Sequence, residues 1–299
     1  MHRDPDVNTA RAGAGRTALV TGATSGIGRA LAEALAAAGA TVGIVARDAT
    51  RGEAVRTAIG ATTGNPAVRI IAADLSNQAD VRRLAAEVTA SFPRIEILVH
   101  CAAVYLPRRT LTADGLETMF ATNQLAPFLL TNLLRDHLVA SAPARVLIMT
   151  APSTVKLDFD DLQGERRFRS LSAFGASKAA DLLLTFELAR RFEGTGVTVN
   201  AVHPGLVRTN LMRRAPAPLR WATWLLSAAP ERAAAAVAAI ALMPEYADLN
   251  GRFFKSGREI EAPAYTHDPD VARRLWEVDT ALAGEPPAPL DATAASGAG

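Results

Sequence analysis

Short apolar runs separated by longer amphipathic stretches organise most of this chain. A short apolar run bounded by polar residues is typical of a buried strand, whereas apolar residues three and four apart indicate one face of a helix. The first pattern predicts strands at residues 18–20, 41–46, 68–73, 95–99, 145–150, 197–202 and 251–255. The second predicts helices at residues 29–38, 77–91, 113–138 and 233–243. The last of these reads as a buried helix and is too short to span a bilayer.

The turn after the first predicted strand carries the clearest candidate chemistry. The chain there reads Thr21-Gly22-Ala23-Thr24-Ser25-Gly26-Ile27-Gly28, and a helix closed by Gly39 follows. Glycines let the backbone approach a pyrophosphate, and the N-terminus of the helix supplies unpaired N–H groups and a positive dipole. Strand, glycine turn and helix in this order begin a βαβ unit, so we predict a dinucleotide site here. A purely structural turn is the alternative.

Composition narrows the class of protein. The chain has 299 residues, 49% hydrophobic and 21% charged, with a net charge of +2. These values are typical of a soluble globular protein and give no indication of a nucleic-acid surface. A lone cysteine, Cys101, excludes an internal disulfide and indicates no metal cluster. The first residues lack an apolar signal core and no apolar run is long enough to span a bilayer, so we expect a cytoplasmic protein.

The spacing of the glycine turn resembles that of the short-chain dehydrogenase/reductase family. The resemblance covers about residues 16–282, and residues 161–167 and 252–277 resemble its retinol-dehydrogenase-like branch. It implies one α/β domain of the Rossmann type, a doubly wound parallel sheet, over residues 16–283. It also implies bound NAD(P), a Ser–Tyr–Lys–Asn active site and a homo-oligomer formed through the long helices. Residues 1–15 and 284–299 are expected to be mobile tails.

The second predicted strand suggests which dinucleotide binds. Arg47 follows it, where the dinucleotide fold usually has an acidic residue for the ribose 2′-hydroxyl. An arginine there can pair with a 2′-phosphate, which favours NADP(H) over NAD(H), although a solvated surface arginine is the alternative. The resemblance places Asp74 at the adenine amino group, while capping of the next helix is its other possible role. The remaining cofactor contacts it implies are Gly22, Thr24, Ser25, Gly26, Ile27, Gly28, Leu75, Cys101, Ala102, Ala103, Lys178, Pro204, Gly205, Val207 and Thr209.

Two stretches near the expected cofactor site are compared with the family pattern. Residues 100–103 read His-Cys-Ala-Ala where the family usually has Asn-Asn-Ala-Gly, so Cys101 replaces an asparagine and is expected to be structural. Asn123 matches the family's active-site asparagine, which distorts its helix and positions a water near the lysine. Asparagine is unfavourable inside a helix, and Pro127 predicts a kink in the same pattern.

The positions that transfer protons in the family differ most from the family pattern. The chain reads Phe174-Gly175-Ala176-Ser177-Lys178 where the family has Tyr-x-x-x-Lys, so the lysine is kept and the phenol is absent. Positions i and i+4 share a helix face, which places Lys178 beside the ring. The family's catalytic serine falls on Ala151. Ser153 is the nearest possible replacement, although a turn hydroxyl is its simpler role.

The last third of the chain contains candidate substrate residues. Residues 206–229 hold Met212, Trp221, Trp224, Leu225 and Leu226 among prolines, which favours a lobe for a bulky hydrophobic substrate. A patch for a membrane surface or a protein partner is the alternative. His203 precedes Pro204 and Gly205, and a structural role is favoured over a catalytic one.

Three functions remain open from the sequence. The first is an atypical NADP(H)-dependent reductase whose acceptor, of a specialised-metabolite kind, needs no tyrosine: an iminium, a quinone, a quinone methide or a conjugated enone. Its proton would come from water near Lys178 and Asn123, from Tyr105 or from the substrate. The second is a non-redox isomerase, cyclase or dehydratase with NADP structural or absent. The third is a catalytically silent binding subunit.

Overall fold

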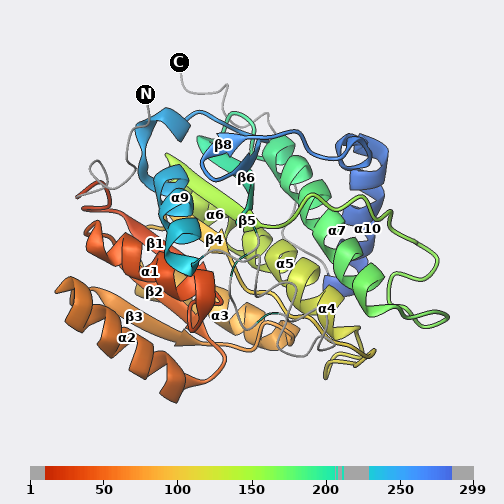
Figure 1. Cartoon of the computed structure of the whole chain (residues 1–299), viewed down its shortest axis with the longest axis horizontal. Helices are drawn as coiled ribbons and strands as arrows, with labels where there is room; N and C mark the ends of the chain where they lie inside the picture. Colours follow the sequence, from red (N-terminus) through yellow and green to blue (C-terminus); the bar gives the residue numbers. More distant parts are fainter. Residues whose placement is uncertain (1–10, 206, 208–210, 212–228, 285–299) are drawn as a thin grey trace.

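The computed structural model describes residues 11–205, 207, 211 and 229–284. Its centre is one eight-stranded sheet with the strand order β3-β2-β1-β4-β5-β6-β7-β8 (Figure 1). The strands are β1 (Thr17–Thr21), β2 (Thr41–Ala46), β3 (Val68–Ala72), β4 (Ile97–His100), β5 (Ala144–Met149), β6 (Val197–His203), β7 (Phe253–Lys255) and β8 (Arg258–Glu259). Every neighbouring pair is parallel except β7 and β8. All seven predicted strands are confirmed, and β8 is an additional antiparallel edge.

Helices cover both faces of the sheet, which makes the fold doubly wound. One face carries α1 (Gly26–Ala37), α2 (Ala49–Thr63) and α9 (Pro230–Leu242). The other carries α3 (Gln78–Ser91), α5 (Ala126–Leu133), α7 (Ser170–Arg191) and α10 (Pro269–Ala283) (Figure 1). Short turns at η3 (Pro244–Tyr246) and η4 (Ala264–His267) join the last elements. Because strands of such a sheet are buried on both faces, they appear in the sequence as continuous apolar runs. All six residues of β5 are buried.

The long helix predicted over residues 113–138 is wrong in its start and its continuity. Residues 113–117 are not helical, and Leu111 forms an isolated bridge with Glu117. The Glu117 carboxylate then caps α4 (Thr118–Phe120) by accepting hydrogen bonds from Met119 N and Phe120 N at 3.0 and 2.8 Å. A π-helical turn, η1 (Ala121–Leu125), separates α4 from α5, and α6 (Arg135–Ala140) follows a break at Leu134.

The expected distortion of this helix is confirmed, but its centre differs from Pro127. The irregular turn η1 contains Asn123, whereas Pro127 occupies the first turn of α5. Proline is tolerated in a first turn because the N–H it lacks has no partner there. The asparagine therefore lies at the irregular part of the helix.

The two expected tails and the expected substrate lobe are only partly covered by the described residues. Residues 1–10 and 285–299 of the expected tails lie outside the described residues, whereas residues 11–15 form a turn against the end of α1. Gly13 N donates a hydrogen bond to Ala38 O at 3.0 Å. Of the expected substrate lobe, residues 206, 208–210 and 212–228 lie outside the described residues, including Thr209, Met212 and both tryptophans. Within the described residues, no helix is long and apolar enough to cross a membrane.

Candidate nucleotide and proton-transfer site

The glycine turn lies between the end of β1 and the start of α1. Gly22 has φ +67°, and a Cβ built on it would lie 2.7 Å from Ala102 Cα. A Cβ on Gly28 would collide with the carbonyl oxygen of Gly22. Both positions therefore require glycine. Ser25 precedes α1 in an extended conformation, and its side chain makes no capping hydrogen bond. Within the described part of the chain, the first N–H groups of α1 therefore have no capping side chain from Ser25. This arrangement fits a pyrophosphate.

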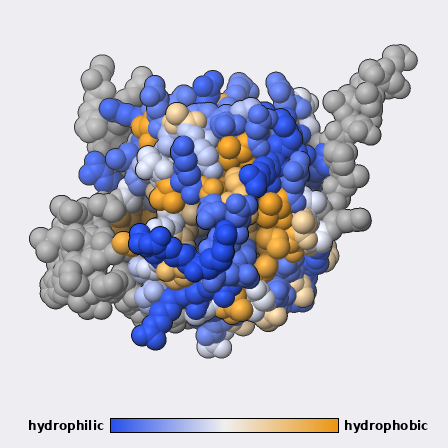
Figure 2. Space-filling model, turned by 90° about the vertical axis from the view of Figure 1, so that its right-hand side faces the viewer, coloured by the Kyte–Doolittle hydropathy of each residue, from blue (hydrophilic) through white to orange (hydrophobic). Residues whose placement is uncertain are grey.

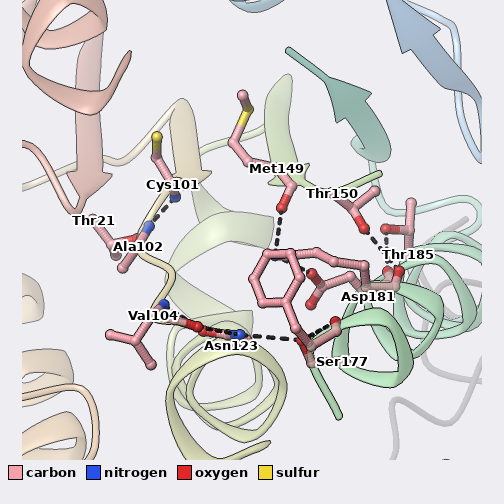
Figure 3. Close-up of polar contacts among 12 residues, drawn as sticks. Thr21, Cys101, Ala102, Val104, Asn123, Met149, Thr150, Ser177, Asp181 and Thr185 are labelled. Carbon is pink, nitrogen blue, oxygen red and sulfur yellow. Dashed lines mark hydrogen bonds and ion pairs between the residues drawn. The ribbon is translucent and has the colours of Figure 1, made fainter. Parts of the chain in front are cut away.

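Residues 101–103 lie across this turn because strands β1 and β4 are neighbours. The Thr21 hydroxyl accepts hydrogen bonds from Cys101 N and Ala102 N at 3.0 and 3.1 Å (Figure 3). The two segments are thus held side by side at the point where the strand order reverses, which is where ligands bind in such sheets. Burial raises the pKa of the Cys101 thiol to about 12. A thiol of this kind is not a nucleophile, which agrees with the structural role expected for it.

The expected adenosine end opens into a cavity of about 520 Å³ whose lining includes Arg47, Asp74, Ser76, Asn77 and Leu106. The exposed Arg47 side chain has no hydrogen-bond or ion-pair partner among the described residues. Asp74 Oδ1 accepts hydrogen bonds from Ser76 N and Ser76 Oγ at 2.9 and 2.8 Å. The idea that Asp74 caps the next helix is wrong: Asn77 Oδ1 caps α3 by accepting from Asp80 N. Leu75 packs against the core.

Asn123 connects three elements through its carboxamide. Its Oδ1 accepts from Val104 N at 2.8 Å, and its Nδ2 donates to Val104 O and Ser177 Oγ, both at 3.1 Å (Figure 3). Ser177 Oγ in turn donates to Phe174 O at 2.8 Å. All polar atoms of the buried carboxamide are thus used within the protein, and they hold η1 against the loop after β4 and against α7.

Lys178 and Phe174 lie together on α7, as their spacing predicts. The Lys178 ammonium is 5.8 Å from the centroid of the Phe174 ring, a cation–π distance. The ammonium also donates to Met149 O at 3.2 Å and to Asp181 Oδ2 at 2.8 Å. Both side chains of this ion pair are buried, with exposed fractions of 7% for Lys178 and 1% for Asp181. Figure 3 shows Met149 and Asp181 next to this site.

Ala151, at the family's serine position, and Ser153, its possible replacement, lie in the loop after β5. Ala151 follows β5 without a hydroxyl, and Ser153 lies two residues on, where its N–H donates to Ala151 O at 2.7 Å. A Cβ built on Gly175 would lie 3.3 Å from Ser153 Oγ. The loop therefore brings the Ser153 hydroxyl to α7 at the residue after Phe174. That hydroxyl also accepts a hydrogen bond from Val155 N at 3.3 Å.

Tyr105 contacts Phe174 but directs its hydroxyl elsewhere. The two rings meet edge to face at 5.7 Å. The Tyr105 hydroxyl is 3.0 Å from Ser170 Oγ, one helical turn before Phe174 on α7. Around these rings lies an apolar cluster that also contains Leu106, Met119, Val104, Phe168, Ala173 and Leu211. The Phe174 ring therefore packs among apolar side chains.

The end of β6 contributes the last candidates. Pro204, Gly205 and Val207 follow the strand, and Gly205 has φ +81°. Burial lowers the pKa of His203, whose ring lies 6.5 Å from that of Phe253. Its Nδ1 has no hydrogen-bond partner among the described residues.

A group of buried acidic residues was missed by the sequence analysis. Besides Asp181, it includes Asp279 on α10, whose Oδ2 accepts from Gln124 Nε2 at 2.7 Å. Burial raises the pKa of Asp181 to about 6 and that of Asp279 to about 8. The spacing of Lys178 and Asp181, i and i+3, could have predicted their contact. Its burial could not be predicted from that spacing.

An open, doubly wound sheet with a glycine turn between β1 and α1 is typical of dinucleotide-binding proteins. A family model for short chain dehydrogenases matches residues 16–219. Human retinol dehydrogenase 13 is 39% identical over 282 residues, which cover 90% of this chain and 85% of that protein. Human retinol dehydrogenase 11 is 37% identical over 277 residues, covering 91% and 87%. The chain belongs to the short-chain dehydrogenase/reductase family, a family of oxidoreductases that bind nicotinamide cofactors, and has retinol-dehydrogenase-like relatives.

Solved structures support the same assignment. A short chain dehydrogenase from Burkholderia cenocepacia J2315 in complex with NADP has a TM-score of 0.66 and 30% identity, over 81% of this chain and 96% of that one. The Pseudomonas aeruginosa RhlG/NADP active-site complex has a TM-score of 0.68 and 28% identity, over 89% of this chain and all of that one. The single Rossmann-type domain predicted from the sequence is confirmed.

Proposed function

We propose that this protein is an atypical NADP(H)-dependent reductase that acts on a bulky hydrophobic acceptor of the specialised-metabolite kind. The observation that carries the proposal is the Phe174 ring beside the Lys178 ammonium, in a site whose nucleotide turn is otherwise built. Ordinary ketone reduction needs a donor for the alkoxide that forms. Loss of a positioned general acid typically costs about 10²–10⁴-fold in rate. The acceptor should therefore be strongly electrophilic: an iminium, a quinone, a quinone methide or a conjugated enone.

The residues of this chain fit the parts of the dinucleotide. The Gly22 to Gly28 turn would hold the pyrophosphate, Arg47 the 2′-phosphate, and Asp74 the adenine. NADPH supplies a hydride when bound. The protein's own part is to exclude water and to orient the acceptor, and the apolar cluster around Phe174 supports a hydrophobic substrate. The naming of the relatives as retinol dehydrogenases also supports this.

Rapid mixing with 4-deuterated NADPH tests the reaction class. A naphthoquinone, an aryl enone and a cyclic iminium are the acceptors, and we expect loss of the near-ultraviolet absorbance of NADPH with deuterium in the product. The Gly22→Val variant is the control, because its side chain would block the turn and should abolish cofactor binding. Conversion without label transfer would instead support a non-redox isomerase, cyclase or dehydratase. No conversion of any acceptor would favour a silent binding subunit.

We also propose that the protein is a cytoplasmic homo-oligomer. Residues 177–189 of α7 are all buried within one chain, partly under α10, so a partner would have to use another surface. The start of α7 is one such surface, because Leu171 is 58% exposed. Figure 2, which views the side of α7 and α10, shows hydrophilic and hydrophobic areas next to each other on this face. Light scattering on the eluting protein tests the assembly, and a monomer mass would contradict it.

A further inference from the structure

The ion pair beside Phe174 leaves one donor of Lys178 without a partner among the described residues. An ammonium has three N–H donors and no acceptor. Asp181 Oδ2 takes one donor at 2.8 Å and Met149 O takes a second at 3.2 Å. With two donors fixed inside the protein, the direction of the third is fixed as well. Asp181 therefore neutralises the lysine, and Asp181 and Met149 together orient it.

The surroundings of Asp181 keep the pair charged at neutral pH. Besides Lys178 on its own helix, Thr150 after β5 lowers the pKa of Asp181 by hydrogen bonding. The other acid nearby is Asp279 on α10, whose own pKa is raised to about 8, so it is mostly uncharged at neutral pH. Burial raises the pKa of Asp181 to about 6, while Lys178 opposes this rise. Asp181 Oδ1 has no hydrogen-bond partner among the described residues. The geometry shows one direct hydrogen bond to the carboxylate from a charged group, that of the Lys178 ammonium to Oδ2.

We propose that Asp181 is a positioning residue that holds Lys178 as the proton donor of this site, in place of the missing phenol. The inference rests on the proposed reductase function. When a quinone, a quinone methide or an enone takes up hydride, the electron pair moves to its oxygen, and one proton leaves Lys178 Nζ to form the new O–H bond. An iminium becomes a neutral amine and does not need this proton. Lys178 is then a neutral amine beside the Asp181 carboxylate. Water returns one proton to the amine, so the pair is unchanged after each turnover.

The pH dependence of single-turnover reduction tests the positioning role. Using the naphthoquinone, we expect the wild-type rate to fall as pH decreases through about 6, because protonation of Asp181 breaks the ion pair. Asp181→Asn should be slower at neutral pH. Its rate should also not show the fall at low pH, which is the acid limb of the pH profile. Asp279→Asn is the matched control: it removes a buried carboxyl that does not contact the lysine, and it should keep the limb. An unchanged limb in Asp181→Asn would overturn the proposal.

Lys178→Arg separates charge from proton donation. A guanidinium keeps the positive charge but does not give up a proton in proteins. We expect a loss of about 10²–10⁴-fold in rate, the usual range for a general acid. If Lys178→Arg reduces the quinone at the wild-type rate while deuterium still reaches the product, the reductase function holds and this inference fails. If wild-type protein transfers no deuterium to any acceptor, both fail.

A measurement on the cofactor-free protein tests the pair without turnover. With ¹³Cγ-labelled aspartate, the Asp181 resonance is identified by its absence from Asp181→Asn. It should titrate near pH 6 in wild type and at higher pH in Lys178→Met, where the opposite charge is gone. Lys178→Arg should stay near the wild-type value, and it serves as the folded comparison if the methionine variant is unstable. An Asp181 signal that titrates at the wild-type pH in both Lys178 variants would show that the ion pair does not form.

Discussion

At the scale of single residues, Phe174 and Ala151 lack the two hydroxyls that the resemblance to the family leads us to expect at these positions. The Phe174 ring lies 5.8 Å from the Lys178 ammonium, so a hydroxyl added to its edge would enter the neighbourhood of a cation. We expect Phe174→Tyr to raise reduction of an unactivated aryl ketone by about 10²–10⁴-fold, the usual contribution of a general acid. Initial rates of NADPH oxidation measure this.

The matched control for that gain is Phe168→Tyr. Phe168 belongs to the same apolar cluster but lies outside the helical face that carries Lys178, so it should leave ketone reduction unchanged. The Phe174→Tyr gain should increase further with Ala151→Ser. A Phe174→Tyr variant that folds, binds NADPH and reduces no ketone would contradict the view that the missing phenol limits the chemistry.

We expect Arg47 to discriminate between NADPH and NADH. Its exposed side chain has no partner among the described residues and lines the cavity with Asp74. Hydrogen bonds to charged groups contribute about 1.5–3 kcal/mol, which corresponds to about 10–100-fold in affinity. We expect Arg47→Ala to weaken NADPH binding by this factor and to leave NADH binding unchanged. Fluorescence titration of both cofactors measures the difference.

Arg56→Ala is the control for the Arg47 experiment. Arg56 lies on α2 and is paired with Glu53 at 2.8 Å on the surface. Its removal should affect neither cofactor. If Arg47→Ala weakens NADPH and NADH equally, Arg47 does not contact the 2′-phosphate.

At the scale of elements, Asn123 ties an irregular helical turn to two neighbours. Asn123→Ala would leave the N–H and C=O of Val104 without their partner, at a cost of about 1–3 kcal/mol in the free energy of unfolding. Because Val104 follows residues 101–103, we also expect weaker NADPH binding. Urea unfolding and fluorescence titration measure the two effects.

Asn132→Ala separates stability from positioning. The Asn132 carboxamide donates a hydrogen bond to Phe128 O within α5, and Asn132 is also buried. Its loss should reduce the free energy of unfolding without changing cofactor affinity. Equal effects of the two variants on NADPH binding would mean that Asn123 acts only through stability.

The elements also show what could be predicted from the sequence. Parallel strands buried on both faces are apolar along their whole length, so all seven were found from their composition. The start of α4 was missed because Glu117, a helix cap, is fixed by a bridge to Leu111 that no periodicity indicates. The Lys178–Asp181 contact has a helical spacing, but its burial comes from packing of η1, β5 and α10 on α7. Such packing depends on residues distant in sequence.

At the scale of the whole molecule, buried titratable groups make stability depend on pH in opposing ways. Burial lowers the pKa of His100 to about 3, and its Nε2 is 2.8 Å from Thr131 Oγ1. Below about pH 6.5, His100 is therefore protonated in the unfolded state but not in the native state. Its contribution reduces the free energy of unfolding as pH falls. The buried acids act in the other direction. Their pKa values are raised, so the native state keeps protons that the unfolded state has lost, and stability falls as pH rises.

Between pH 6.5 and 8, Asp279 should dominate this dependence. Burial raises its pKa to about 8, whereas His100 and Asp181 titrate mainly below this window. We expect the wild-type free energy of unfolding to fall by about 1.5 kcal/mol across it. Asp279→Asn should be flat, because a carboxamide does not titrate. Urea unfolding at half-unit steps of pH measures both slopes.

Asp279→Asn should also retain the free energy of unfolding of wild type near pH 6.5, because its carboxamide can pair with Gln124. Gln124 Nε2 donates to Asp279 Oδ2, while Gln124 Oε1 and Asp279 Oδ1 have no partner among the described residues. A protonated carboxyl offers one donor and one acceptor to such a neighbour, and an asparagine carboxamide offers the same two. Asp279→Asn should therefore match wild type near pH 6.5 and exceed it at pH 8. Asp270→Asn, which removes an exposed carboxylate on the same helix, should keep the wild-type slope. If Asp279→Asn is as steep as wild type, α10 is not held on η1 by a neutral acid, and the pH dependence arises elsewhere.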